Sequence, residues 1–104
     1  MIDDAIRCLL HAPHCGDNAP SLDDIEDKLT SGYARALELD AERRRLERRL
    51  AETAANMGER SEHSDLAELG RLLSAADGDL AELRALLSSL RARADEARTR
   101  ANVA

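Results

Sequence analysis

Apolar side chains recur along most of the chain in alternating steps of three and four residues, the spacing of one face of an α-helix in a coiled coil. The first run follows Pro20 and predicts a helix over residues 22–57. Its ladder positions are Leu22, Ile25, Leu29, Gly32, Ala36, Leu39, Arg43, Leu46, Leu50, Thr53 and Met57. A polar segment, residues 59–64, interrupts the pattern and predicts a turn.

A second run with the same spacing follows the turn and predicts a helix over residues 64–101. Its ladder positions are Leu66, Leu69, Leu73, Ala76, Leu80, Leu83, Leu87, Leu90, Ala94, Ala97 and Ala101. Gly32, Gly70 and Gly78 lie inside the two predicted helices. Because glycine costs about 1 kcal/mol relative to alanine in a helix, these positions are the expected weak points.

Local signals mark the ends of the two helices. Ser21 and Asp24 form a Ser-x-x-Asp variant of the capping box at the start of the first helix. Gly58 is the expected C-terminal stop of that helix, and Ser61 or Ser64 can cap the second.

Two helices of similar length joined by a short turn pack antiparallel. Folding them about the turn sets Gly32 opposite Ala94, and paired ladder positions then sum to about 126. The pairs expected on one flank are Glu26 with Arg98, Tyr33 with Arg91, Asp40 with Arg84, and the unfavourable Glu47 with Asp77.

The first 20 residues form a separate region. Ile2, Ile6, Leu9 and Leu10 have helical spacing, and Pro13 ends the pattern, so we expect a short helix. The chain therefore divides into an N-terminal arm, residues 1–20, and a helical hairpin, residues 21–104.

Composition supports an all-α fold. The 104 residues are 43% hydrophobic but only 1% aromatic, and 35% are charged, which is typical of long helices and coiled coils. Ordering a residue costs about 1.5 kcal/mol, whereas burying a leucine returns about 1.5–3 kcal/mol, so a two-helix seam is marginally stable. We therefore predict a long antiparallel, coiled-coil-like two-helix hairpin with a short N-terminal helical arm, completed to a bundle by dimerisation or by a bound partner.

Charge and hydropathy bear on the partners. A net charge of −6 argues against sequence-independent nucleic-acid binding, which needs a basic surface. No stretch approaches the roughly 20 apolar residues that span a bilayer, so we expect no membrane contact and a cytoplasmic location.

Residue types found in metal and catalytic sites are few. Cys8, His11, His14 and Cys15 carry zinc-ligand chemistry, but their spacing matches no common zinc finger, so two free thiols and two solvated histidines are the preferred interpretation. His63 lies near two serines but has no third group to orient it. We expect no catalytic residue, no metal and no cofactor, and hence no enzyme.

The segment from Arg43 to Arg49 is rich in arginine, but Glu42, Glu47 and Glu52 interleave with it. A salt-bridged, solvated helix face is therefore favoured over a phosphate-binding patch. Arg43 itself occupies a ladder position, where a polar residue typically fixes the register.

The leading functional hypothesis is a non-catalytic protein–protein interaction or regulatory module that presents one face of the hairpin to another protein or to a second copy. The favoured flank contains large apolar groups and facing cations, including the pairs Lys28 with Arg100 and Arg35 with Arg93. The residues expected to bind a partner are Tyr33, Arg35, Leu72, Leu86 and Arg93. Alternatively, the N-terminal arm covers the same flank within one chain.

Two further hypotheses remain open. In the first, the chain is a small ligand-gated regulator that clamps an anionic nucleotide, as helical-hairpin anti-sigma factors hold cyclic di-GMP. Their Glu-x3-Ser-x2-Arg-x3-Gln-x3-Asp motif is met here only at Ser88 and Arg91, so the chain is not assigned to that family. In the second, it is a small secreted helical hairpin of the Trp-x-Gly type, although Asn56, Met57 and Gly58 stand at the turn and no tryptophan is present.

Overall fold

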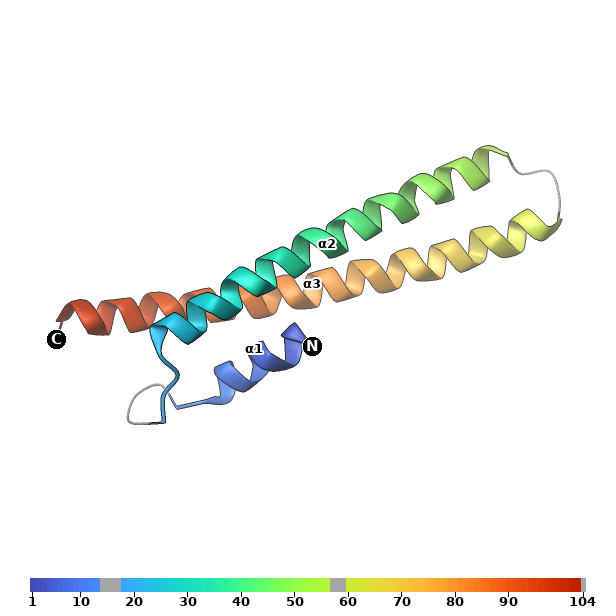
Figure 1. Ribbon diagram of the computed structural model, residues 1–104. Coiled ribbons are helices and arrows are strands. Elements are labelled where there is room, and N and C mark those ends of the chain that lie inside the picture. The colour runs from blue at the N-terminus through green and yellow to red at the C-terminus, as the bar shows by residue number, and fades with distance from the viewer. Residues whose placement is uncertain (14–17, 57–59, 104) are drawn as a thin grey trace. The chain divides into compact units, whose positions relative to one another are not determined.

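In the computed structural model the described residues are 1–13, 18–56 and 60–103, and within these ranges the chain is helical with no strand. The helices are α1 (Ile2–His11), α2 (Leu22–Ala55) and α3 (Arg60–Val103). Helix α3 returns antiparallel to α2 and packs against it (Figure 1). The predicted all-α hairpin with a short N-terminal helix is thereby confirmed.

The start of α2 follows the capping prediction. Ser21 Oγ accepts a hydrogen bond from the backbone N–H of Asp24 at 3.1 Å, and Asp23 and Asp24 place negative charge in the first turn. Helix α1 ends at His11, and Ala12 adopts an extended conformation (φ −71°, ψ 158°) of the kind that a following proline favours.

The turn is shorter than the sequence predicts. Helix α2 ends at Ala55 rather than near residue 57, and α3 begins at Arg60, four residues before the expected cap Ser64. Gly58, the expected stop signal, lies outside the described residues. Helix α3 continues through Gly70 and Gly78, and α2 continues through Gly32.

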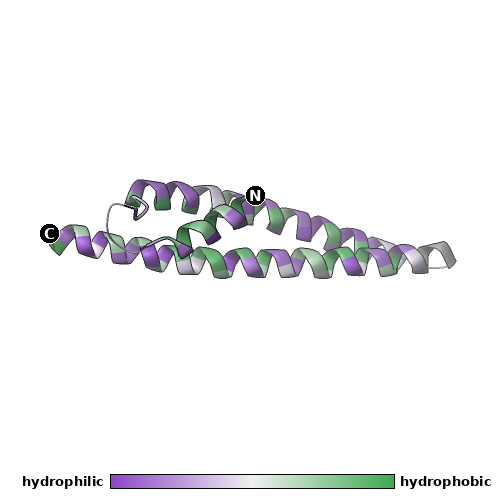
Figure 2. Cartoon of the chain, turned by 90° about the horizontal axis from the view of Figure 1, so that it is seen from below, coloured by the Kyte–Doolittle hydropathy of each residue, from purple (hydrophilic) through white to green (hydrophobic). Residues whose placement is uncertain are grey.

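The ladder positions form the interface between α2 and α3, as predicted. Among the described ladder residues, only Ala101 is exposed, and the rest are buried or half-buried. Hydrophobic and hydrophilic segments alternate along both long helices at the helical period (Figure 2). The fully buried side chains in α3 include Leu83 and Leu90.

The chain divides by spatial contacts into two compact units. One unit is made of two separate stretches of the sequence, and the other of a single stretch. Unit 1 comprises Met1–Ala36 and Glu82–Ala104, and unit 2 comprises Leu37–Ala81. Unit 1 contains α1, the start of α2 and the end of α3, so it is a three-helix arrangement. Unit 2 contains only the remaining parts of α2 and α3.

Helix α1 docks within unit 1. Ile6 is 0% exposed and lies close to Gly32 of α2, and Arg7 forms an ion pair with Glu82 of α3. The arm therefore contacts the hairpin within unit 1, whereas Leu72, which the predicted alternative also placed under the arm, belongs to unit 2 and is 44% exposed.

The contacts between α2 and α3 in unit 1 include a predicted flank pair and one neighbour that was not predicted. The flank pair Glu26–Arg98 forms, at 2.7 Å. A Cβ atom placed on Gly32 would collide with Leu87. Side chains tilt toward the N-terminus of their own helix, and in an antiparallel pair this tilt brings long side chains of higher combined residue number together.

Candidate interaction surfaces

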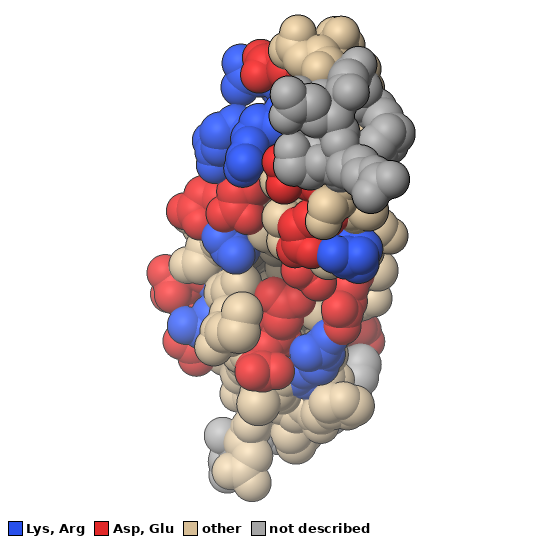
Figure 3. All heavy atoms as spheres, turned by 90° about the vertical axis from the view of Figure 1, so that its right-hand side faces the viewer, with Lys and Arg blue, Asp and Glu red and all other residues tan. Residues whose placement is uncertain are grey.

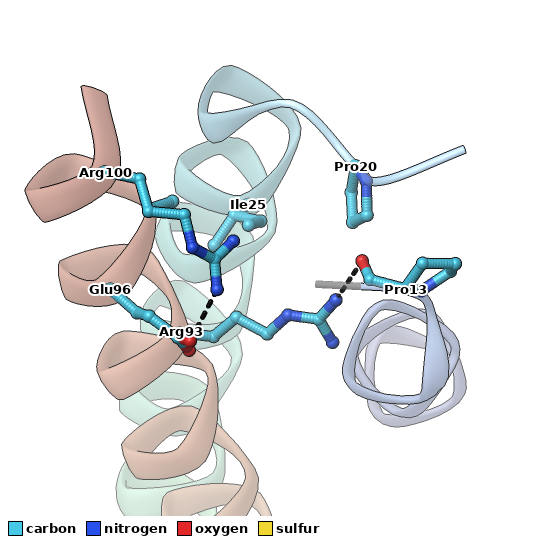
Figure 4. A pocket seen from close by; sticks show the side chains of 7 residues that line it. Pro13, Pro20, Ile25, Arg93, Glu96 and Arg100 are labelled. Atoms are coloured by element: carbon cyan, nitrogen blue, oxygen red, sulfur yellow. Dashed lines mark hydrogen bonds and ion pairs between the residues drawn. The ribbon is translucent and has the colours of Figure 1, made fainter. Parts of the chain in front are cut away.

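Arg93 is the one buried charged side chain among the described residues, with 7% exposure. Its Nη1 donates hydrogen bonds to the carbonyl oxygens of Leu9 at 2.6 Å and Leu10 at 2.8 Å. Its Nη2 donates to those of Ala12 at 2.5 Å and Pro13 at 2.6 Å. Figure 4 shows the guanidinium reaching from α3 toward the carbonyl of Pro13.

This geometry makes Arg93 a cap for the C-terminal end of α1. The last carbonyl groups of a helix have no partner within the helix, and a cation there is favoured by the helix dipole. The sequence predicts that Arg93 faces Arg35. In the structure, the guanidinium of Arg93 donates hydrogen bonds to four backbone carbonyls of its own chain. Arg35 is half-buried and also has an interaction partner within the chain.

The other residues that the sequence predicts to bind a partner are divided between the two units. Leu86 is half-buried in unit 1, and Leu72 is 44% exposed in unit 2. Tyr33 is 43% exposed in unit 1. A partner-binding role for these residues, and for Arg93, stays a prediction.

Tyr33 lies between two shallow hollows of unit 1, which we together call the Tyr33 groove. One hollow of about 280 Å³ is lined by Tyr33, Ala36, Arg84, Leu87, Ser88 and Arg91. The other, of about 300 Å³, is lined by Leu29, Tyr33, Arg91, Asp95 and Arg98. No residue of α1 lines either hollow, and the buried side chains of Leu29 and Leu87 form the apolar floor.

The arginines of the Tyr33 groove differ in their pairing. Arg98 donates to Glu26 at 2.7 Å and to Asp95 at 2.8 Å, and the hydrogen bond that Glu26 accepts is the main reason that the pKa of Arg98 is raised. Arg84 and Arg91 are exposed, and neither makes a hydrogen bond or ion pair with another residue that the structure describes. The sequence had paired Arg84 with Asp40, but Asp40 instead binds Arg43 and Arg44, at 3.0 and 2.9 Å.

In the part of the chain that the structure describes, unit 2 consists only of segments of α2 and α3. Leu39, Leu69, Ala76 and Leu80 are buried there, but Leu46, Leu50, Leu66 and Leu73 are only half-buried. Outside the ladder, Leu37 is 73% exposed and Leu72 is 44% exposed. The apolar side chains of unit 2 are therefore less completely covered than those of unit 1.

Three carboxylates surround Arg43, the charged residue in the seam of unit 2. Its guanidinium lies 3.0 Å from Asp40, 2.6 Å from Glu47 and 3.6 Å from Asp77. The hydrogen bond with Asp40, followed by the charge of Glu47, raises the pKa of Arg43. The expected repulsion between Glu47 and Asp77 is thereby offset by a cation that contacts both carboxylates.

A hollow on unit 2 is lined by Glu42, Arg45, Leu46 and Arg49. Figure 3 shows one face of the molecule, on which acidic and basic side chains lie side by side. This mixture agrees with a solvated, charge-paired face rather than a uniform basic surface.

Two of the four residues with zinc-ligand chemistry, Cys8 and His11, lie in the described part of the chain. Cys8 is an exposed free thiol, while His14 and Cys15 lie outside the described ranges. No group of three or more His, Cys, Asp or Glu side chains that could hold a metal ion occurs in the part of the chain that the structure describes. Across that same part, no helix combines the length and apolar character that a bilayer crossing requires.

Comparison with protein-family models, with curated protein sequences and with solved structures finds no match to this chain.

Proposed function

We propose that the protein is a non-catalytic interaction module that associates with a second copy of itself through unit 2. The observation that carries this proposal is the unequal cover of the seam. Helix α1 supplies a third helix in unit 1, whereas four ladder leucines of unit 2 are only half-buried, namely Leu46, Leu50, Leu66 and Leu73. A second copy of unit 2 would supply two further helices and complete a four-helix bundle.

The surface proposed for this contact surrounds Leu46 and Leu72. Arg43 and Asp77 contact each other across the seam, at 3.6 Å. Continuing the antiparallel register from that pair, we expect Leu72 of α3 near the level of Leu46 of α2. Leu46 lies in the hollow lined by Glu42, Arg45 and Arg49. An apolar centre with a charged rim is the usual composition of a protein interface.

The charges around Leu46 are self-complementary. In a twofold symmetric contact the same surface meets itself, so each residue must tolerate its opposite number. If two α2 helices pack antiparallel about Leu46, Glu42 of one copy lies near Arg49 of the other, and the reciprocal pair forms as well. This arrangement favours a second copy over an unrelated partner.

Sedimentation velocity over low to high micromolar concentrations tests the proposal. The wild-type chain of 11.4 kDa should shift toward twice that mass as its concentration rises. Leu72→Asp should weaken the association about tenfold or more, because it places a charge in an apolar interface. Leu37→Asp is the matched control, since Leu37 is also an exposed leucine of unit 2 but flanks the opposite side of the ladder.

Two outcomes would overturn this assignment. One is a wild-type chain that stays monomeric and fully helical at every concentration, which would leave a different protein as the occupant of unit 2. The other is an equal effect of Leu72→Asp and Leu37→Asp, which would show that the contact does not centre on Leu72.

A further inference from the structure

The Tyr33 groove is a second surface, and nothing in the self-association of unit 2 uses it. Tyr33 is the only aromatic residue of the chain, yet it is 43% exposed rather than packed in the core. Tyrosine and arginine are the residues most enriched at the energetic centres of protein interfaces. Here the tyrosine lies between Arg84 and Arg91, which have no described partner.

The positions of the two arginines set the geometry of a ligand. Arg84 and Arg91 are seven residues apart on α3, or about 10.5 Å along the helix axis, and lie on the same face. Ser88 lies between them, and Tyr33 and Leu87 form the apolar part of the groove. The surface is therefore an apolar strip with a cation near each end.

A second copy of the same surface would fit poorly. In a twofold contact about Ser88, Arg84 of one copy would approach Arg91 of the other, so that both ends of the interface would bring like charges together. The carboxylate nearest the groove, Asp95, is already bonded to Arg98. Charge complementarity thus favours an acidic partner over self-association at this site.

We propose that the Tyr33 groove binds an acidic α-helix of another protein, with carboxylates seven residues apart that pair with Arg84 and Arg91. A helix lying along α3 presents residues i and i+7 on one face with the same spacing as the two arginines. An apolar residue at i+3 or i+4 then packs on Tyr33 and Leu87. The proposal goes beyond unit 2 self-association and does not depend on it.

The probe is a fluorescein-labelled, alanine-based helical peptide with two glutamates seven residues apart and a leucine between them. Fluorescence anisotropy should show saturable binding that weakens as salt is added. Arg84→Glu, Arg91→Glu and Tyr33→Ala should each weaken binding about tenfold or more. Arg48→Glu makes the same charge change at an exposed arginine of unit 2 that also lacks a described partner, and should change affinity less than about twofold.

Exchanging the charges of the peptide and of the groove tests whether these two arginines pair with the two glutamates. A peptide with lysines in place of the glutamates should bind the double variant Arg84→Glu/Arg91→Glu and not the wild type. Circular dichroism of each variant should show unchanged helicity, because all four substituted side chains are exposed.

The proposal is overturned by any of three results. A peptide with its glutamates on opposite helix faces could bind as tightly as the probe, which would remove the requirement for spacing. Inorganic pyrophosphate could displace the probe at low concentration, which would assign the groove to a small anion. Finally, Arg48→Glu could weaken binding as much as Arg84→Glu. Leu72→Asp should leave peptide binding unchanged. The peptide assay therefore tests the Tyr33 groove alone, and sedimentation tests the self-association of unit 2.

Discussion

Gly32 lies where all three helices of unit 1 meet. A Cβ atom at this position would collide with Leu87 and would come within 3.2 Å of Ile6 Cδ1. Both neighbouring side chains are almost completely buried and have little room to move. By contrast, a Cβ on Gly70 or Gly78 would meet nothing within 4 Å. These three glycines therefore have different roles, although each lies inside a continuous helix.

Substitution by alanine should change stability in opposite directions at these sites. Gly70→Ala and Gly78→Ala should each raise the free energy of unfolding by about 0.5–1 kcal/mol, because alanine is the better helix former. Gly32→Ala should lower it by about 1 kcal/mol, since overpacking outweighs the gain in helix propensity. Urea denaturation followed by circular dichroism measures all three. An increase for Gly32→Ala would show that Leu87 and Ile6 repack freely.

At the residue scale, the sequence predicts burial better than it predicts polar partners. Ladder residues such as Leu83 and Leu90 are buried because the spacing of a helix face fixes which side chains point into the seam. The role of Arg93 was not predictable in this way. Its four acceptors are backbone carbonyls 80–84 positions away in the sequence, and backbone groups leave no sequence signal.

At the scale of elements, α1 is too short to be stable alone. Isolated helices of fewer than about 12–15 residues are marginal in water, and α1 has 10 residues. Its stability depends on burying Ile6 and on the contacts at its two ends. Asp3 and Asp4 lie in its first turn, and Arg93 lies at its last, so charges of the favourable sign stand at both ends.

Replacing Arg93 should release α1 while leaving the rest of the hairpin helical. Arg93→Ala removes a charged donor of four hydrogen bonds and should destabilise the docked arm by about 2 kcal/mol. Arg93→Lys should have an intermediate effect, because one ammonium group cannot reach all four carbonyls. Hydrogen exchange of the α1 amides is the measurement, with Arg91→Ala as the exposed control. Unchanged α1 protection in Arg93→Ala would mean that Ile6 alone holds the arm.

The ladders alone define the register between α2 and α3 only to within whole heptads. A shift of seven residues places ladder positions on ladder positions again, with the same apolar pattern. Charged flank residues narrow the choice, and the predicted pair Glu26–Arg98 forms at 2.7 Å. The start of α3 was placed too late, because Ser61 and Ser64 both offer capping side chains, whereas α3 begins at Arg60.

At the scale of the whole molecule, the two units differ in how many helices share each core. Leu83, Leu87 and Leu90 of unit 1 are almost completely buried, whereas Leu46 and Leu73 of unit 2 are half-exposed. Local stability follows the buried apolar contacts that must be broken for a segment to open. Unit 2 of an isolated chain should therefore open more readily than unit 1.

Hydrogen exchange with mass spectrometry should reveal this order. Amides of residues 37–55 and 66–81 should exchange faster than those of residues 25–36 and 82–95 in dilute protein. Raising the protein concentration should slow exchange in unit 2 selectively, because a ligand that binds only the folded form stabilises it. Uniform protection along both helices, independent of concentration, would contradict the unequal cover.

Unit 1 is built from the two ends of the described chain, and this has a consequence for biosynthesis. Translation proceeds at about 5–20 residues per second, so Ile6 and Gly32 leave the ribosome seconds before Leu87 and Arg93 exist. Unit 2 is continuous in sequence and can pair its helices before unit 1 is complete. During that interval the nascent arm has neither its hydrophobic contact nor its cap, so α1 is the last helix to become fixed even though it is the first to be made.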